Sequence, residues 1–179
     1  MRLDYRIIRS NRKTIALQIK PDGQLEVRCP RKMTEDAVRR FVESKASWIE
    51  KHLSQLPPQT EPKFTPTEIQ QLRKQTEELV CRRLSYYAGM VGVEYNRVTV
   101  RCQRTLWGSC SGKGNLNFNC LLALAPPQVL DYVVVHELCH RKHLNHAKPF
   151  WEEVARVLPD YKQSRAWLKQ HGNALIYKI

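Results

Sequence analysis

The stretch DYVVVHELCHRKHLNHAKPFW, residues 131–151, decides how the rest of this chain is interpreted. Its segment HELCH has the H-E-x-x-H pattern of zinc-dependent hydrolases. Residues four apart on an α-helix share one face, so His136 and His140 can converge on one ion with Zn–N bonds of about 2.0–2.1 Å. Glu137 leaves the helix about 100° further round, where its carboxylate can take a proton from a water beside the metal.

A third protein ligand is needed to complete a catalytic zinc site and leave one position for water. His146 stands ten residues after His136, which is the offset of the last histidine in the longer pattern H-E-x-x-H-x-x-G-x-x-H. His143 is the competing ligand, but seven residues along one straight helix climb about 10 Å, which disfavours it. Acidic alternatives further along are Glu152 and Glu153.

The residues around the motif predict a buried helix that ends soon after it. Val133, Val134, Val135 and Leu138 make a segment that is apolar on most sides, as expected of a core helix that carries a site. The glycine that ends the helix in the longer pattern is absent here. We expect Asn145 to end it instead, because asparagine tolerates the left-handed conformation.

Two segments together resemble a known family. The stretch RTLWGSCSGKGNLNFN, residues 104–119, followed by residues 131–151, is similar to the YgjP-like metallopeptidase domain. That family is similar to the SprT-like and WLM groups of zincin-type proteins. The resemblance covers nearly the whole chain and implies a zinc-peptidase-like site. It implies that His136, His140 and His146 bind the metal and that Glu137 is the catalytic residue.

Length and composition indicate a globular protein. The chain has 179 residues, 42% of them hydrophobic and 26% charged, which suits one sizeable core with an appendage. It has no apolar run approaching the ~20 residues of a membrane span, and its first residues lack the apolar segment of a signal peptide. We therefore expect a cytoplasmic protein. Six cysteines without any C-x-x-C pair are expected to remain thiols, and Cys110 and Cys139 lie near the proposed site in sequence.

The overall fold class predicted is α+β: an N-terminal antiparallel β unit with a helix, followed by a zincin-like helix-and-sheet core. Three alternating runs predict three short antiparallel strands, with Pro21-Asp22-Gly23 as the turn between the last two. The runs are Leu3, Tyr5, Ile7; Ile15, Leu17, Ile19; and Leu25, Val27, Cys29. Thr34 is expected to cap one covering helix, with apolar residues at helical spacing as far as Leu53.

Proline-rich residues 56–66 predict a linker, which divides the chain into an N-terminal unit, residues 1–55, and a catalytic domain, residues 67–179. Thr65-Pro66 is a good start for a long helix that runs to Gly89 or Gly92. Its expected apolar stripe consists of Ile69, Leu72, Leu79, Val80 and Leu84.

A hairpin is predicted ahead of the histidine helix. Residues 97–102 alternate as a strand that residues 104–107 could extend, residues 108–114 form a glycine-rich reversal, and residues 115–119 return. We expect the returning strand to border the metal cleft with an exposed edge. An extended peptide could pair with that edge through main-chain hydrogen bonds.

The last third of the chain predicts two helices behind the site. Pro149 opens the first and Pro159 breaks it, Asp160 caps the second and Gly172 closes it. Phe150 and Trp151 are expected to pack against the back of the metal site and to fix where the third histidine can reach. The polar residues Tyr161, Arg165 and His171 are expected to be packing or surface residues.

The constellation favours a zinc metallopeptidase whose general base is Glu137, acting on a protein or peptide. The sequence does not identify the donor to the tetrahedral oxyanion, although His143 is a candidate. The net charge of +13 indicates an acidic partner, and nucleic acid is one such partner. Two alternatives remain open: a metal-dependent nucleotide triphosphate pyrophosphatase or phosphohydrolase, and a noncatalytic DNA-binding module with a structural zinc.

Overall fold

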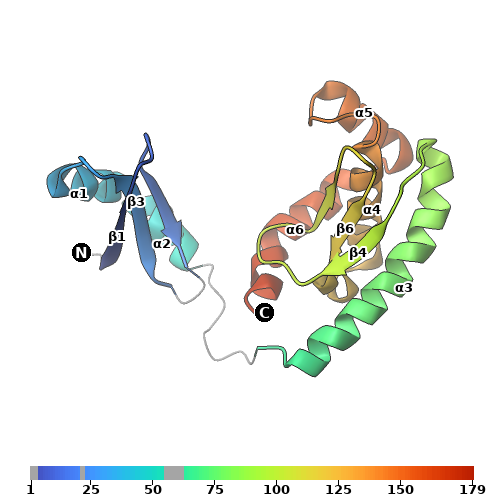
Figure 1. The fold of residues 1–179 in the computed structure, drawn as a ribbon, viewed down its shortest axis with the longest axis horizontal. Coiled ribbons are helices and arrows are strands. Elements are labelled where there is room, and N and C mark those ends of the chain that lie inside the picture. Colours follow the sequence, from blue (N-terminus) through green and yellow to red (C-terminus); the bar gives the residue numbers. More distant parts are fainter. Residues whose placement is uncertain (1–3, 21–22, 55–62) are drawn as a thin grey trace. The chain divides into compact units, whose positions relative to one another are not determined.

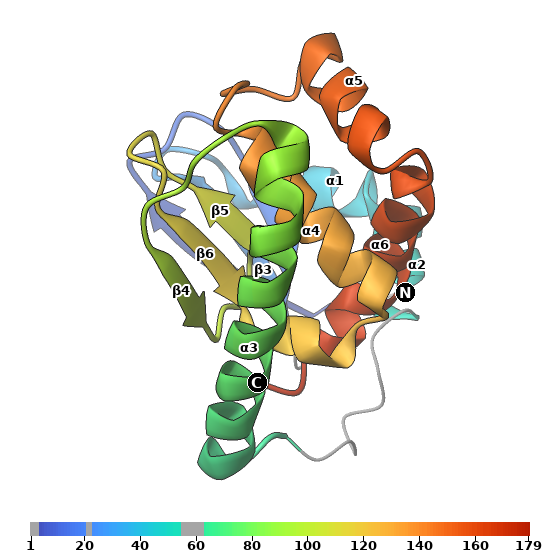
Figure 2. The same ribbon diagram turned by 90° about the vertical axis from the view of Figure 1, so that its right-hand side faces the viewer.

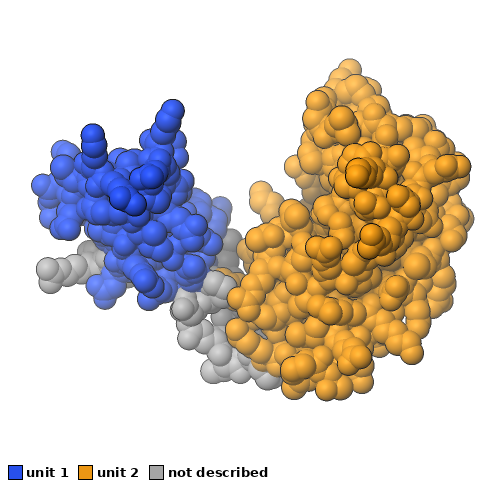
Figure 3. Space-filling model, viewed as in Figure 1, with its two compact units in different colours: residues 1–61 blue, residues 62–179 orange. Residues whose placement is uncertain are grey.

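The computed structural model of the chain describes residues 4–20, 23–54 and 63–179, drawn in colour in Figure 1. The chain divides into two compact units, residues 1–61 and 62–179, which Figure 3 colours separately. The domain boundaries predicted from the sequence stay a prediction, because most of the expected linker, residues 56–62, lies outside the described residues. Among the described helices, none is long and apolar enough to cross a membrane.

The first unit is built on a three-stranded sheet in the order β1-β3-β2, formed by β1 (Tyr5–Ser10), β2 (Ala16–Ile19) and β3 (Leu25–Pro30). The expected all-antiparallel sheet is wrong. β2 is antiparallel to β3, but β1 pairs parallel to β3, because two chain reversals place the third strand rather than the second in the middle. Gly23 closes the turn before β3 with φ of 81°, and its backbone N–H donates a hydrogen bond to the Lys20 carbonyl. Leu3, Pro21 and Asp22, named in the prediction, lie outside the described residues.

Two helices, not one, cover this sheet: α1 (Glu35–Glu43) and α2 (Ala46–Leu53). Thr34 caps the first as predicted, accepting the Ala37 amide. The predicted continuous helix breaks because Ser44 Oγ donates to the Phe41 carbonyl and Lys45 leaves helical geometry. The fully buried core side chains of the unit come from β3 and both helices: Val27, Cys29, Val38 and Ile49.

The second unit begins with the long helix α3 (Pro66–Val91), as predicted. Thr65 and Glu68 form a reciprocal capping box, and Gly92 ends the helix in the left-handed conformation with φ of 73°. The expected apolar stripe is only partly right. Leu79 is exposed, and its place is taken by Thr76, which is buried because its hydroxyl donates to the Cys120 carbonyl at 2.7 Å.

A second sheet has the order β4-β6-β5, with β4 (Val98–Arg101), β5 (Gly108–Cys110) and β6 (Leu116–Asn119). β4 pairs parallel and β5 antiparallel to β6, so the returning strand is central rather than an exposed edge. The prediction placed residues 108–110 in the reversal, but they form β5, one of the two edge strands, and residues 104–107 do not extend β4. Asn119 holds that irregular segment by donating to the carbonyls of Gln103 and Leu106.

A 3₁₀ turn (Cys120–Leu124) leads into the helices α4 (Pro127–Cys139), α5 (Lys148–Val157) and α6 (Tyr161–Ile176). Figure 2 shows α4 behind α3, with the strands on one side and α6 on the other. Helix α4 is therefore buried on most sides, as its run of valines predicts. Gly172 does not close α6. It lies within the helix, and an added Cβ would meet the Trp107 ring at 3.0 Å, so glycine lets the indole pack closely against α6.

Candidate metal centre

Helix α4 carries His136 and Glu137 in its last turn and ends at Cys139, with His140 as its C-cap. The predicted stop at Asn145 is wrong, since no described residue other than glycine has a positive φ. Asn145 instead accepts the Ala147 amide through its side-chain oxygen at 3.2 Å. The chain thus leaves the helix immediately after the second histidine and turns back towards it.

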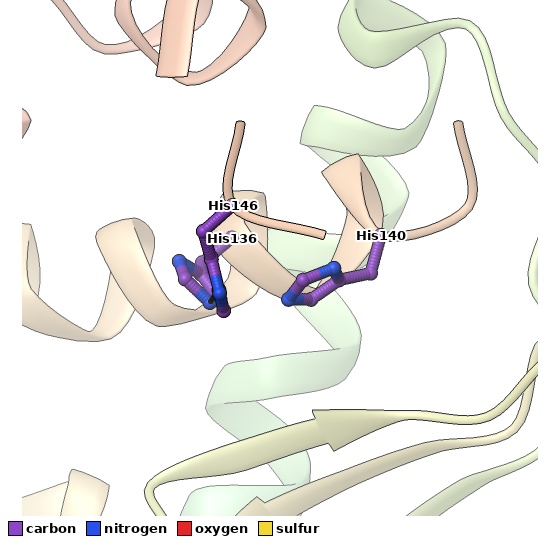
Figure 4. Close-up of side chains that lie close together, drawn as sticks. All are labelled: His136, His140 and His146. Carbon is purple, nitrogen blue, oxygen red and sulfur yellow. Dashed lines mark hydrogen bonds between the residues drawn. The ribbon is translucent and has the colours of Figure 1, made fainter. Parts of the chain in front are cut away.

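This turn brings three imidazoles together. One nitrogen each from His136, His140 and His146 lies within 4.8 Å of the other two, and Figure 4 shows the rings grouped over the end of α4. The Nε2 atoms of His136 and His146 are 3.0 Å apart. The competing ligands serve elsewhere: the His143 carbonyl receives a hydrogen bond from His140, and Glu153 pairs with Lys142 at 2.8 Å and with Arg156.

Neighbouring groups orient each ring. His140 Nδ1 lies 2.9 Å from the His143 carbonyl, so Nδ1 carries the proton and Nε2 keeps its lone pair for a metal. The Tyr132 hydroxyl lies 3.5 Å from His136 Nδ1. Trp151 donates its indole N–H to the His146 carbonyl at 3.0 Å. This bond fixes a histidine that is otherwise exposed.

Phe150 and Trp151 pack against the cluster, as predicted. The Phe150 ring centroid lies 4.6 to 4.8 Å from those of all three histidines. The Trp151 ring stacks on the His146 ring with a centroid distance of 5.6 Å and on the Tyr161 ring with a centroid distance of 5.4 Å. Proline at the start of α5 places both aromatic residues in the first turn, directly after the loop that carries the third histidine.

Burial controls the electrostatics of the site. Burial, where the charged imidazolium is poorly solvated, and then the charges of His140, His146 and Arg165 together lower the pKa of His136 to about 3. Burial also raises the pKa of Glu137 to about 8. The Oε2 atom of Glu137 is buried without a hydrogen-bond partner among the described residues. Neutral imidazoles beside a carboxyl group with a free oxygen fit a divalent cation and a water as their ligands.

Gly108 is a site residue that sequence reasoning missed. A Cβ on Gly108 would lie 2.5 Å from Glu137 Oε1 and 2.8 Å from its Cγ, so only glycine leaves room for this carboxyl group. The only sign of this role in the sequence was that a glycine stands at the start of the predicted reversal. Trp107, Gly108, Tyr132, Val133, His136, Glu137 and Leu168 line a cavity of about 180 Å³ beside the cluster.

The other polar and cysteine residues singled out in the sequence lie at different positions around the cluster. Tyr161 is buried and stacks between Tyr132 and Trp151, whereas His171 bonds to the Trp167 carbonyl away from the cluster. Arg165 lies over the Trp151 ring at 4.7 Å. Cys139 is fully buried, and its contacts are those of a packing residue, as predicted. Burial, followed by the charge of Glu137, raises the pKa of the Cys110 thiol.

Comparison with known proteins adds a family to this geometry. No curated protein matches the chain. Among solved structures, the metallopeptidase zymogen of Pyrococcus abyssi abylysin is similar at 24% identity, with a TM-score of 0.44, over 52% of this chain and 93% of that one. The family model described as YgjP-like, metallopeptidase domain, matches residues 13–72 and 67–171. Since these segments span most of the chain, it belongs to the YgjP-like metallopeptidase domain family.

Proposed function

We propose that this protein is a zinc-dependent metallopeptidase in which His136, His140 and His146 hold the zinc and Glu137 is the general base. A metallopeptidase domain implies a catalytic metal and a protein or peptide substrate. The observation that carries the proposal is the meeting of three imidazoles beside a buried carboxyl oxygen that has no other partner among the described residues. Three protein nitrogens with one position left over are typical of catalytic rather than structural zinc.

The residues of the chain divide the chemistry between them. Zinc bound at the histidines would polarise the substrate carbonyl and lower the pKa of a water towards about 7. Glu137 accepts the proton of the attacking water and then returns it to the leaving amine. Burial raises the pKa of this carboxyl group to about 8 in the protein alone, and Gly108 leaves space for the side chain on the strand side.

The position of the substrate follows from the sheet. β6 is paired on both sides, whereas β4 and β5 each pair with β6 alone, so these two strands are the edges of the sheet in the described part of the chain. Gly108 of β5 lies against Glu137. We propose that an extended peptide pairs with β5 and thereby places its scissile bond over the histidines. A helix that ends at the histidine cluster beside an edge strand supports a zincin-like arrangement of this unit.

The alternative nucleotide hydrolase is less well supported. The cavity beside the cluster, about 180 Å³, is smaller than the roughly 300–1,000 Å³ of sites that enclose a small molecule. Such a space suits one side chain of a longer substrate that lies mainly along the surface. A DNA-binding module with structural zinc does not explain a buried general base with a free oxygen beside the histidines.

The Glu137→Gln variant tests this proposal. Glutamine keeps the shape of the side chain but cannot take the proton, so we expect zinc content to be retained and casein hydrolysis to fall roughly 100- to 10,000-fold. Zinc-loaded wild type and variant are compared on casein and on ATP. Undiminished casein cleavage by the variant would remove Glu137 from its role, and turnover of ATP alone would overturn the assignment as a peptidase.

A further inference from the structure

Helix α6 brings a cation to the rim of the histidine cluster. The Arg165 guanidinium carbon lies 4.7 Å from the centroid of the Trp151 ring. That ring stacks on the imidazole of His146 and bonds to its backbone carbonyl. Arg165 is therefore held on an aromatic platform that is itself fixed to a proposed metal ligand, although its side chain remains exposed to solvent.

Arg165 has no carboxylate partner in the described part of the chain. Arg141, beside His140, donates to the backbone carbonyls of Glu94 and Gly112, and the other nearby cations form ion pairs. Lys142 and Arg156 both pair with Glu153, and Lys148 pairs with Glu152.

Peptide hydrolysis at this site requires a donor that the proposed mechanism does not yet contain. When water adds to the carbonyl carbon, a C–O bond forms and the π electrons move to the carbonyl oxygen, which becomes an oxyanion. The candidate from the sequence, His143, is outside the imidazole cluster and contributes its backbone carbonyl. The Tyr132 hydroxyl is buried against His136.

We propose that Arg165 is a catalytic residue that donates a hydrogen bond to the oxyanion of the tetrahedral intermediate. This inference rests on the proposed peptidase function and deepens it. When the intermediate collapses, the C–N bond breaks, the amine takes its proton from Glu137, and Arg165 keeps all of its own protons. A guanidinium is suited to this task because it is always charged and presents planar, fixed donors.

A binding experiment isolates the oxyanion contact from turnover. The probe is N-phosphoryl-Leu-Trp, whose tetrahedral phosphoryl group imitates the intermediate, and N-acetyl-Leu-Trp is the planar control. Calorimetry uses zinc-loaded Glu137→Gln protein with and without Arg165→Met. We expect Arg165→Met to weaken binding of the phosphoryl probe about 10- to 100-fold and to leave the acetyl probe within about twofold. An equal effect on both probes, or none, overturns the inference.

Kinetics supplies the second measurement. In an otherwise wild-type chain, Arg165→Met should lower kcat for casein-derived peptides roughly 100-fold while KM changes less than about threefold. Arg165→Lys should recover part of that loss. Lys169→Met is the matched control, because it removes an exposed cation from the same helix and should leave kcat unchanged. An equal loss in Lys169→Met would show a general charge effect and would overturn the inference.

The alternative that Arg165 only supports Trp151 and His146 predicts a different result. In that case Arg165→Met would weaken zinc binding and affect both probes alike, whereas we expect its zinc affinity to equal that of the wild type. If the wild type cleaves casein but binding of the phosphoryl probe is unchanged by Arg165→Met, this inference fails and the peptidase proposal stands. If no peptide is cleaved and neither probe binds, both fail.

Discussion

At the scale of single residues, the proposed site depends on the burial and close packing of the Glu137 carboxyl group. Glu137 is 4% exposed, lies at the end of a buried helix and faces the backbone of β5 at Gly108. Its pKa is raised to about 8 by burial alone, so the position of the side chain and its basicity have one common cause. Any change that moves this carboxyl group affects both properties.

Gly108→Ala tests this close contact. The added methyl group would lie 2.5 to 2.9 Å from three atoms of Glu137, so the side chain must shift, and none of these three nearest atoms belongs to a histidine. We expect hydrolysis to fall roughly 100-fold with zinc content unchanged, since displacement of a catalytic group by about 1 Å has effects of that order. Gly112→Ala is the control, because nothing lies within 4 Å of its added methyl group. Equal activity in both variants would contradict the proposed tight fit.

At the scale of elements, the spacing of residues in the sequence predicts those features that depend on interactions between near neighbours in the chain. Thr65 and Gly92 delimit α3 because caps act within one turn, and the histidine spacing predicts a cluster because residues four apart share a helical face. Features that depend on distant partners were missed. The parallel pairing of β1 depends on which strand becomes central, and Gly172, expected to end α6, lies inside the helix with Trp107 packed against it. No pattern near β5 showed that residues 108–110 form an edge strand.

Glu153 of α5 pairs with Lys142 in the loop after α4. This ion pair joins the two segments that position the third histidine. Arg156, followed by Lys142, lowers the pKa of Glu153 from 4.5 to about 2, and Arg156 also bonds to the Met90 carbonyl of α3. A carboxyl group whose pKa is lower in the folded state stabilises the protein above its unfolded pKa, and this contribution is lost as pH falls from about 4.5 towards 2.

Glu153→Gln should therefore lower the free energy of unfolding at pH 7 by about 1–2 kcal/mol, with the difference from wild type vanishing near pH 2. Urea unfolding across this pH range measures it. Glu152→Gln removes a longer and more exposed pair with Lys148 and should change stability by less than about 0.5 kcal/mol. A Glu153→Gln effect that does not depend on pH would contradict the role given to the ion pairs.

At the scale of the whole molecule, everything that the proposal assigns to catalysis lies in residues 62–179. Helix α4 with the loop after it, the edge strand β5 and α6 each contribute one part of the proposed site, namely the ligands and base, the substrate edge, and the cation. Residues 1–61 form a compact unit with its own core and contribute no residue to this assignment. The family model nevertheless matches from residue 13 onward, so both units are part of the family's architecture.

The central claim is that three particular imidazoles share one zinc ion. The most direct measurement is the zinc content per chain of wild type, His146→Ala and His143→Ala after loading and dialysis. The account predicts one zinc per chain in wild type and in His143→Ala, since His143 contributes only its backbone carbonyl, and a loss of zinc in His146→Ala. Zinc retained in His146→Ala but lost in His143→Ala, or no zinc in wild type, would contradict it.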